Sequence, residues 1–275
     1  ALASGPGRIT AEEYVKFELH DSTRYSSADK QAFLTDTLHW PIVRRCCDMS
    51  WLAVTEDKWV AAQMFAASGL PTPQIIAVAG RGPRHYPGAQ NIRSLDHFRR
   101  FLDAWQGRPF FGKRLRGLAS DGVFLCERYD RRSLFLAVRG EVGIDAFYAS
   151  HIAPHAFIFQ PVQRNHAFFE GLCHHLATAR IGALVYPDGV RLAFTFLKMP
   201  GPGHIEDRFH PVGNIACELA PETGEILSIR QRTALGAVSC PVHPETGRPL
   251  IGLRVPWWDR LKEAVAVAAR VFAPV

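Results

Sequence analysis

The stretch that decides the fold runs from Arg180 to Gly224 and reads RIGALVYPDGVRLAFTFLKMPGPGHIEDRFHPVGNIACELAPETG. It begins with two runs rich in β-branched and aromatic residues, 181–186 and 190–197, which are separated by Pro-Asp-Gly at 187–189. Apolar runs that flank such a turn are typical of a β-hairpin. The sequence therefore predicts an antiparallel sheet in this part of the chain.

A second predicted hairpin joins 214–219 to 225–229 through Pro-Glu-Thr-Gly at 221–224. Polar residues accompany both hairpins, and they are Arg180, Lys198, Glu206, Asp207, His210, Asn214 and Glu218. Strands present alternate residues to one face, so polar groups there can converge on a bound ion or phosphate. We expect a functional site on this sheet.

Length and composition narrow the class of protein. A chain of 275 residues with 47% hydrophobic content can bury a large core. It has no run of 18 or more apolar residues, so we expect no membrane span. The first residues carry neither an initiator Met nor a signal-peptide pattern, which indicates a trimmed sequence. The six Cys show no C-x-x-C spacing, so reduced thiols in a cytoplasmic protein are expected.

The net charge of +6 permits nucleic-acid binding without favouring it. The Arg and Lys residues are scattered in short clusters, and no basic helix or RNA-binding aromatic signature accompanies them. Phosphorylated small molecules are the better explanation for the positive charge.

Three regions are predicted: 1–70, 71–155 and 156–275. In the first, Thr10 begins a capping box, and a helix over 57–68 ends at Gly69. The second is a small α+β unit with strands at 75–79, 110–115 and 123–128 and a helix at 94–105. The third alternates strands and helices, with a strand at 156–160, a helix at 167–176, the two hairpins and a closing helix at 257–272.

Lys113 lies on a predicted strand and is followed by a glycine-bounded loop, 117–122, that contains Ser120. An ammonium beside free backbone N–H groups suits a nucleotide phosphate. A surface Lys beside an ordinary hairpin loop fits the same residues. The pattern does not match a Walker loop, which places Gly-Lys-Ser/Thr at the start of a helix.

The order of these elements resembles the nucleotide-binding half of an ATP-grasp enzyme. Asp57 and Lys58 open a helix that Gly-Leu-Pro-Thr-Pro ends at 69–73, and a lid with Lys113 and a glycine loop follows. The segment Phe-Ile-Phe-Gln-Pro-Val at 157–162 stands where that fold keeps the hinge that holds adenine.

More closely, the chain resembles the sugar-transfer associated ATP-grasp family. The matching segments are Glu-Glu-Tyr at 12–14, Thr-Ala-Arg at 178–180, the loop at 207–214, His-Pro-Glu-Thr-Gly at 243–247 and Pro-Trp-Trp at 256–258. The resemblance implies an α+β, ATP-grasp-like fold with a helical N-terminal region, a small α+β lid and a larger mixed-sheet domain.

The resemblance also implies a chemistry: an ATP-dependent carboxylate-amine ligase that acts through an acyl-phosphate, with ATP and Mg²⁺ as cofactors and a surface-glycan or natural-product pathway. The implied nucleotide contacts are Lys58, Lys113, Ser120, Gln160 and the backbone of Val162. The implied catalytic residues are Arg180, which faces the acyl-phosphate, Lys198 and His210. The implied magnesium ligands are Asp207 and Glu218.

This sequence departs from the family pattern at several positions. Gln160 stands where the hinge is usually acidic, Arg208 stands where an Asn follows the loop Asp, and Lys198 replaces an Arg. The Glu-x-Asn metal motif expected after the closing helix is absent. Either the strands that carry it lie outside this sequence or the ligand pair is lost.

Two other functions fit parts of the sequence. An ATP-grasp-like module that binds a nucleotide or a partner without ligation would explain Gln160 and the absent motif. Alternatively, His204 and His210 with Glu206 and Asp207 could bind zinc or iron in a metal-dependent hydrolase. Their spacing is not H-E-x-x-H, and the surrounding Gly and Pro disfavour a helix that would align both His.

Overall fold

The computed structural model describes residues 5–117 and 120–273. The chain forms two compact units, one over residues up to 52 and one over 53–273. Among the described helices, none is long and apolar enough to cross a membrane.

The first unit is built from short helices. These are α1 (Ala11–Lys16), α2 (Ser27–Ala32), the 3₁₀ turn Asp36–Leu38, α3 (His39–Cys46) and the 3₁₀ turn Met49–Trp51. The predicted capping box is confirmed, because Thr10 and Glu13 exchange side-chain and backbone hydrogen bonds. Glu13 also accepts from the Thr35 hydroxyl at 2.8 Å and the Asp36 N–H at 2.7 Å. The N–H groups of Thr10 and Asp36 lower the pKa of Glu13 to about 2, so this carboxylate ties the two segments together.

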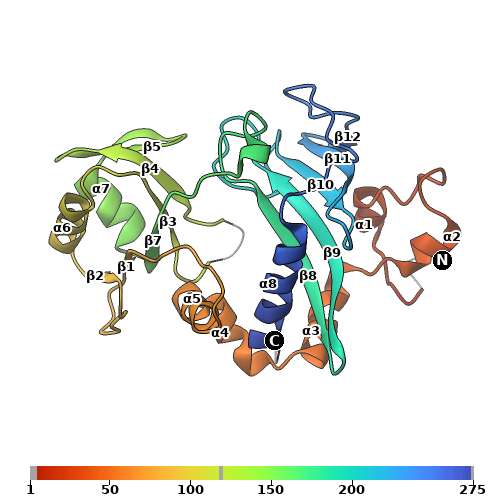
Figure 1. The fold of residues 1–275 in the computed structure, drawn as a ribbon, viewed down its shortest axis with the longest axis horizontal. Coiled ribbons are helices and arrows are strands. Elements are labelled where there is room, and N and C mark those ends of the chain that lie inside the picture. Colours follow the sequence, from red (N-terminus) through yellow and green to blue (C-terminus); the bar gives the residue numbers. More distant parts are fainter. Residues whose placement is uncertain (1–4, 118–119, 274–275) are drawn as a thin grey trace. The chain divides into compact units, whose positions relative to one another are not determined.

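All of α4 (Leu52–Glu56) except its first residue belongs to the second unit, which continues with α5 (Lys58–Ala67) and contains two sheets (Figure 1). The larger sheet has the order β2-β1-β7-β3-β4-β5-β6. Its strands are β1 (Ala77–Ala79), β2 (Gln90–Ile92), β3 (Phe110–Arg114), β4 (Phe124–Tyr129), β5 (Ser133–Leu136), β6 (Gly140–Gly143) and β7 (Phe157–Pro161). Only β1 and β2 run parallel among these pairs.

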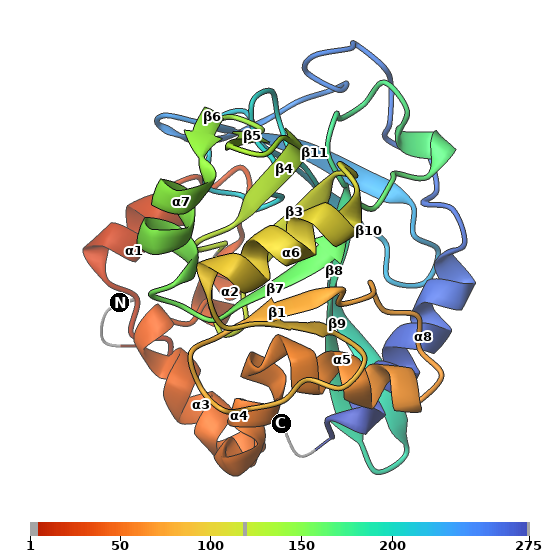
Figure 2. The same ribbon diagram turned by 90° about the vertical axis from the view of Figure 1, so that its left-hand side faces the viewer.

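Two helices pack on this sheet: α6 (Leu95–Trp105), which Figure 2 shows lying across the strands, and α7 (Ile144–Phe147), which continues into a π-helical turn, Tyr148–Ile152. The core between them is aromatic. Its fully buried phenylalanines are Phe98, Phe110, Phe124, Phe157 and Phe159. Phe157 and Phe159 alternate on β7, so one face of the sheet is fixed against the helices.

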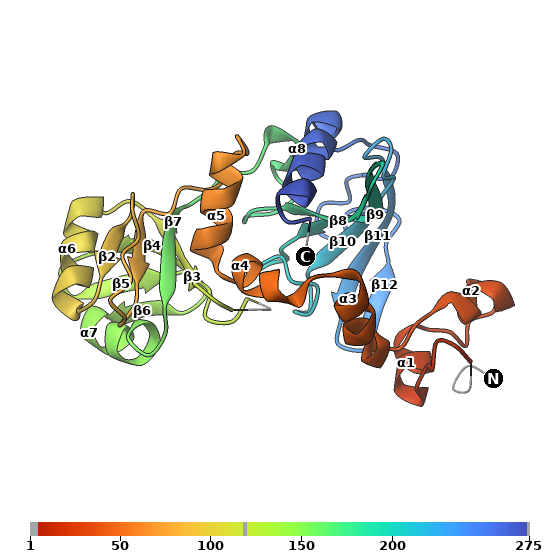
Figure 3. The same cartoon turned by 90° about the horizontal axis from the view of Figure 1, so that it is seen from below.

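The second sheet is antiparallel, in the order β12-β11-β10-β9-β8. Its strands are β8 (Thr178–Tyr186), β9 (Gly189–Met199), β10 (Ile215–Leu219), β11 (Ile226–Thr233) and β12 (Gly236–Ser239). The helix α8 (Trp258–Val271) lies along one side of it (Figure 3). Leu197, Met199 and Cys217 are buried in the core that also contains Trp258, while the alternate residues Phe196 and Glu218 are exposed. One face of this sheet is therefore open.

The structure confirms both predicted hairpins, the helix over 57–68 and the closing helix. The predicted strand at 156–160 is present as β7, but it pairs with β1 and β3, so it belongs to the first sheet. Strands β2, β5, β6 and β12 are short and were not predicted.

The predicted helix over 167–176 is wrong. Only a 3₁₀ turn, Ala167–Phe169, forms there, and Gly171 adopts φ +74°. The side chain of Asn165 donates to the His175 carbonyl at 2.8 Å and accepts from the Ala177 N–H at 2.8 Å. These bonds satisfy backbone groups that a helix would otherwise have paired, which is how Asn competes with helix formation.

The two Pro-Glu-Thr-Gly turns provide a matched test of packing. Gly224 and Gly247 both have positive φ, at +69° and +67°, but a Cβ on Gly224 would lie 2.5 Å from the Trp258 ring, whereas a Cβ on Gly247 meets nothing within 4 Å. We expect Gly224→Ala to lower the free energy of unfolding by about 3 kcal/mol or more, and Gly247→Ala by about 1 kcal/mol. Urea unfolding of both variants measures this, and equal losses would contradict the role of the Trp258 contact.

Candidate functional site

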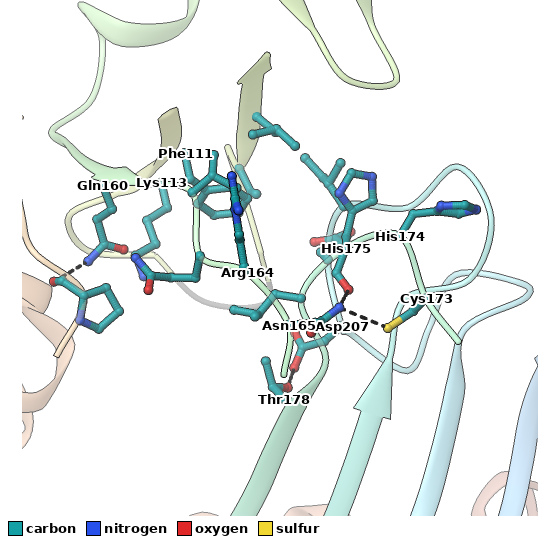
Figure 4. A pocket seen from close by; sticks show the side chains of 18 of the residues that line it. Phe111, Lys113, Gln160, Arg164, Asn165, Cys173, His174, His175, Thr178 and Asp207 are labelled. Atoms are coloured by element: carbon teal, nitrogen blue, oxygen red, sulfur yellow. Dashed lines mark hydrogen bonds between the residues drawn. The ribbon is translucent and has the colours of Figure 1, made fainter. Parts of the chain in front are cut away.

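A cavity of about 920 Å³ opens between the two sheets of the second unit. Its walls come from β3, from the end of β7, from the segment 162–176 and from the loop at 205–207. Figure 4 shows Phe111, Lys113 and Gln160 together at one end and Cys173, His174 and His175 at the other. A hollow of this size is in the range of small-molecule and cofactor sites.

Two lysines face this cavity from different elements. Lys58 is the first residue of α5, and its Nζ donates to the Gly117 carbonyl at 2.9 Å. Lys113 lies on β3, where it is paired with Ile158 of β7. Burial lowers the pKa of Lys58, and burial together with the nearby charge of Lys58 lowers the pKa of Lys113 to about 8. Two cations held this close in a partly desolvated cavity favour the binding of an anion between them.

Asp57 sets the position of Lys58. Its Oδ1 accepts from the Val60 N–H at 3.2 Å and so caps α5, and its side chain is only 1% exposed. Although burial raises the pKa of Asp57, hydrogen bonds from Arg84 and Val60 and the charges of Arg84 and Arg116 hold it below its ordinary value. The carboxylate therefore stays charged and fixes the start of the helix.

Gln160 and Val162 lie at the end of β7. The Gln160 side chain is buried, and its Nε2 donates to the Pro73 carbonyl at 3.1 Å. Val162 follows Pro161, the last residue of β7 that pairs with β3, and is 41% exposed. Val162 is thus outside the β3–β7 ladder and lines the cavity, and its contact with adenine stays a prediction.

Of the predicted glycine loop, Gly117, Ser120 and Asp121 line the cavity. Ser120 lines the cavity with φ +60°, Asp121 pairs with Arg114, and His151 Nε2 lies 3.1 Å from the Gly122 carbonyl and donates to it. Leu118 and Ala119, which the prediction included, lie outside the described residues.

Asp207, in the loop between β9 and β10, is bound to two residues of the second sheet. Its Oδ2 accepts from Lys198 Nζ at 2.7 Å and from the Thr178 hydroxyl. Burial raises the pKa of Asp207, but these hydrogen bonds outweigh it and lower the pKa. Asp207 and Thr178 both line the cavity.

The structure brings Lys58, Lys113, Ser120, Gln160, Val162 and Asp207 together around one cavity. Four other predicted residues are not part of its wall. Lys198 lies behind Asp207, and His210 is exposed in the loop between β9 and β10. Arg180 and Glu218 are exposed on β8 and β10, where both are paired in register with Phe196 of β9.

Several cavity residues escaped the sequence reasoning, chiefly Phe111, Arg164, Asn165 and Thr178. Asn165 shapes the wall by bonding to the backbone at His175 and Ala177. Its only signal in the sequence is an Asn between two predicted elements, which is common in loops. Thr178 had been noted for the family resemblance rather than as a site residue.

The described residues do not form a ready magnesium site. Among them, no three His, Cys, Asp or Glu side chains are grouped as metal ligands. Asp207 is bonded to Lys198 and Thr178, and Glu218 accepts from Ser228 Oγ at 3.2 Å. Magnesium coordination by Asp207 and Glu218 stays a prediction.

The loop 204–210, the candidate zinc or iron site, is held by hydrogen bonds to Val212 and Asn214. His204 Nε2 lies 3.0 Å from the Val212 carbonyl and donates to it, and Asn214 Nδ2 donates to the carbonyls of Glu206 and Arg208 at 3.0 and 2.7 Å. These bonds hold the loop through its backbone and engage Nε2 of His204, which leaves Nδ1 as the ring nitrogen that could bind a metal.

Comparisons with known proteins bear on the family of this chain. The family model for sugar-transfer associated ATP-grasp proteins matches residues 42–275. No curated protein matches the chain. Among solved structures, D-cycloserine synthetase DcsG is similar at 18% identity, over 84% of this chain and 72% of that one, with a TM-score of 0.26. At that TM-score the likeness supports no inference about this chain.

Replacing Lys113 tests whether it contacts a nucleotide. We expect Lys113→Ala to weaken ATP binding by about tenfold or more, because one charge-assisted contact to phosphate is removed. Calorimetric titration with a non-hydrolysable ATP analogue measures the affinity. Lys262→Ala, which removes a lysine on α8 outside the cavity wall, is the matched control. Unchanged affinity in Lys113→Ala would remove this residue from the site.

The pKa of Lys113 predicts a pH dependence. Bound phosphate favours the ammonium, so the pKa rises on binding; affinity is then full below pH 8 and declines as the pH rises above it. We expect a fall of up to about tenfold per pH unit between pH ~8 and the bound-state pKa. Lys113→Arg keeps its proton throughout and should lose this decline. The same decline in the Arg variant would assign it to another group.

Proposed function

Because the chain belongs to the sugar-transfer associated ATP-grasp family, we propose that it is an ATP-dependent ligase that joins a carboxylate to an amine. The observation that supports this best is the pairing of Lys58 and Lys113 at one cavity, where burial and mutual repulsion lower the pKa of Lys113 to about 8. A bound polyphosphate would relieve the repulsion between the two lysines. Phosphoryl transfer depends chiefly on positioning the phosphate and neutralising its charge.

In the proposed reaction, the hinge holds adenine and the two lysines hold the phosphates. Gln160 and Val162 line the wall where the adenine edge would be read. A substrate carboxylate oxygen attacks the γ-phosphorus, the bond to the β-γ bridging oxygen breaks, and ADP leaves. The amine then attacks the acyl carbon and expels phosphate, which gives an amide.

The second sheet would supply the groups around the acyl-phosphate. Arg180 offers a planar fork suited to phosphoryl oxygens, and it is exposed on β8. Lys198 reaches the cavity through Asp207, and His210 is exposed in the following loop. Their roles, magnesium as cofactor and a pathway in surface-glycan or natural-product assembly rest on family membership.

A binding module without ligase activity is the second candidate. The amide of Gln160 is already bonded to Pro73, and the described residues carry no grouped metal ligands. Both observations suit a protein that holds a nucleotide without turning it over.

Two measurements separate these candidates. Calorimetry of the full chain with ADP and with a non-hydrolysable ATP analogue, with and without magnesium, should show magnesium-dependent binding in the micromolar range. Phosphate release from ATP should then require both a carboxylate and an amine from a mixed panel. Binding without such release supports the module, and no binding under any condition sinks both nucleotide proposals.

A further inference from the structure

A second, smaller cavity of about 320 Å³ lies on the first sheet of the same unit, beside the end of β3. Its wall is strongly basic. The lining residues are Arg84, Tyr86, Arg114, Leu115, Arg116, His155 and Ala156. Of these, only Arg114 also lines the larger cavity, so the two hollows are separate sites that meet at one residue.

Three arginine side chains line this hollow, and among the described residues they form ion pairs with only two carboxylates. Oδ2 of Asp57 lies 2.5 Å from Nη1 of Arg84 and 3.4 Å from Nη2 of Arg116. Asp121 forms an ion pair with Arg114. The cavity therefore keeps one positive charge in excess. Arg116 holds Asp57 at the longest of these distances and its side chain is 63% exposed, so its fork can turn to a ligand at small cost.

The remaining groups hold the arginines in place. The guanidinium of Arg84 lies 4.8 Å from the Tyr86 ring centre and 5.4 Å from that of Trp59, which orients its plane. Arg114 lies 3.0 Å from His155 Nε2, and since a guanidinium only donates, that nitrogen accepts. The guanidinium groups of Arg84 and Arg114 are therefore fixed, whereas that of Arg116 can turn. The hollow that they line is large enough for a small ligand.

We propose that this hollow, defined by Arg84, Arg114, Arg116 and His155, is a second anion site that binds a compact phosphate- or carboxylate-bearing molecule, apart from the nucleotide phosphates. Planar forks match the oxygens of phosphate and carboxylate in pairs, and a point charge would not give that selectivity. The site does not depend on the proposed ligase activity, because none of its lining residues is Lys58, Lys113 or Gln160.

Calorimetric titration of the full chain with inorganic phosphate tests the site, and citrate in a second titration distinguishes a carboxylate ligand. We expect Arg116→Gln to weaken binding of the preferred anion by about tenfold, the loss of one charge-assisted contact. Arg100→Gln, an exposed arginine on α6 outside both cavities, removes the same charge and should bind as the unchanged protein does.

The decisive comparison is with Lys113→Ala, which impairs only the larger cavity. Retained anion binding in Lys113→Ala, with loss in Arg116→Gln, supports the second site. The reverse pattern would place the anion among the nucleotide contacts and overturn the proposal, as would binding of neither phosphate nor citrate at millimolar concentration. ADP titration of Arg116→Gln, expected to match the unchanged protein, keeps this outcome distinct from a failure of the ligase proposal.

Discussion

The buried carboxylate of Asp57 is the interaction on which both cavities depend. It caps α5 and so places Lys58 at the larger cavity, and it balances Arg84 and Arg116 at the smaller one. A carboxylate that is 1% exposed must be compensated by charge and hydrogen bonds, and its partners here come from three separate segments. The Asp57 side chain therefore links the start of α5 to the basic residues of both cavities.

Two of the carboxylates that line the larger cavity, Asp121 and Asp207, are engaged with partners other than its two lysines. Asp207 is bonded to Lys198 and Thr178, and Asp121 is paired with Arg114, so neither neutralises the lysines across the cavity. Burial and, after it, the nearby charge of Lys58 lower the pKa of Lys113. Two lysines in a partly desolvated cavity suit a polyphosphate, which agrees with membership of the sugar-transfer associated ATP-grasp family.

Much of the local structure was predictable because its causes are local. The capping box at Thr10, the helix that Asp57 opens and the two hairpins each depend on residues within a few positions of one another. The helix predicted over 167–176 failed for a different reason. Asn165 binds the backbone at His175 and Ala177, and apolar spacing alone does not reveal that competition.

The sequence by itself determined the two hairpins, the helices at 57–68, 94–105 and 257–272, the family resemblance and the residue types that suit a nucleotide. Only the tertiary structure decided which of those residues share a cavity. It placed Lys58 and Lys113 at the same cavity and β7 in the first sheet. It also placed Arg180 and Glu218 on the open face of the second sheet. Burial and charge proximity depend on chain segments that are distant in sequence, so neither the pKa of Lys113 nor the basic hollow at Arg84 can be read from local patterns.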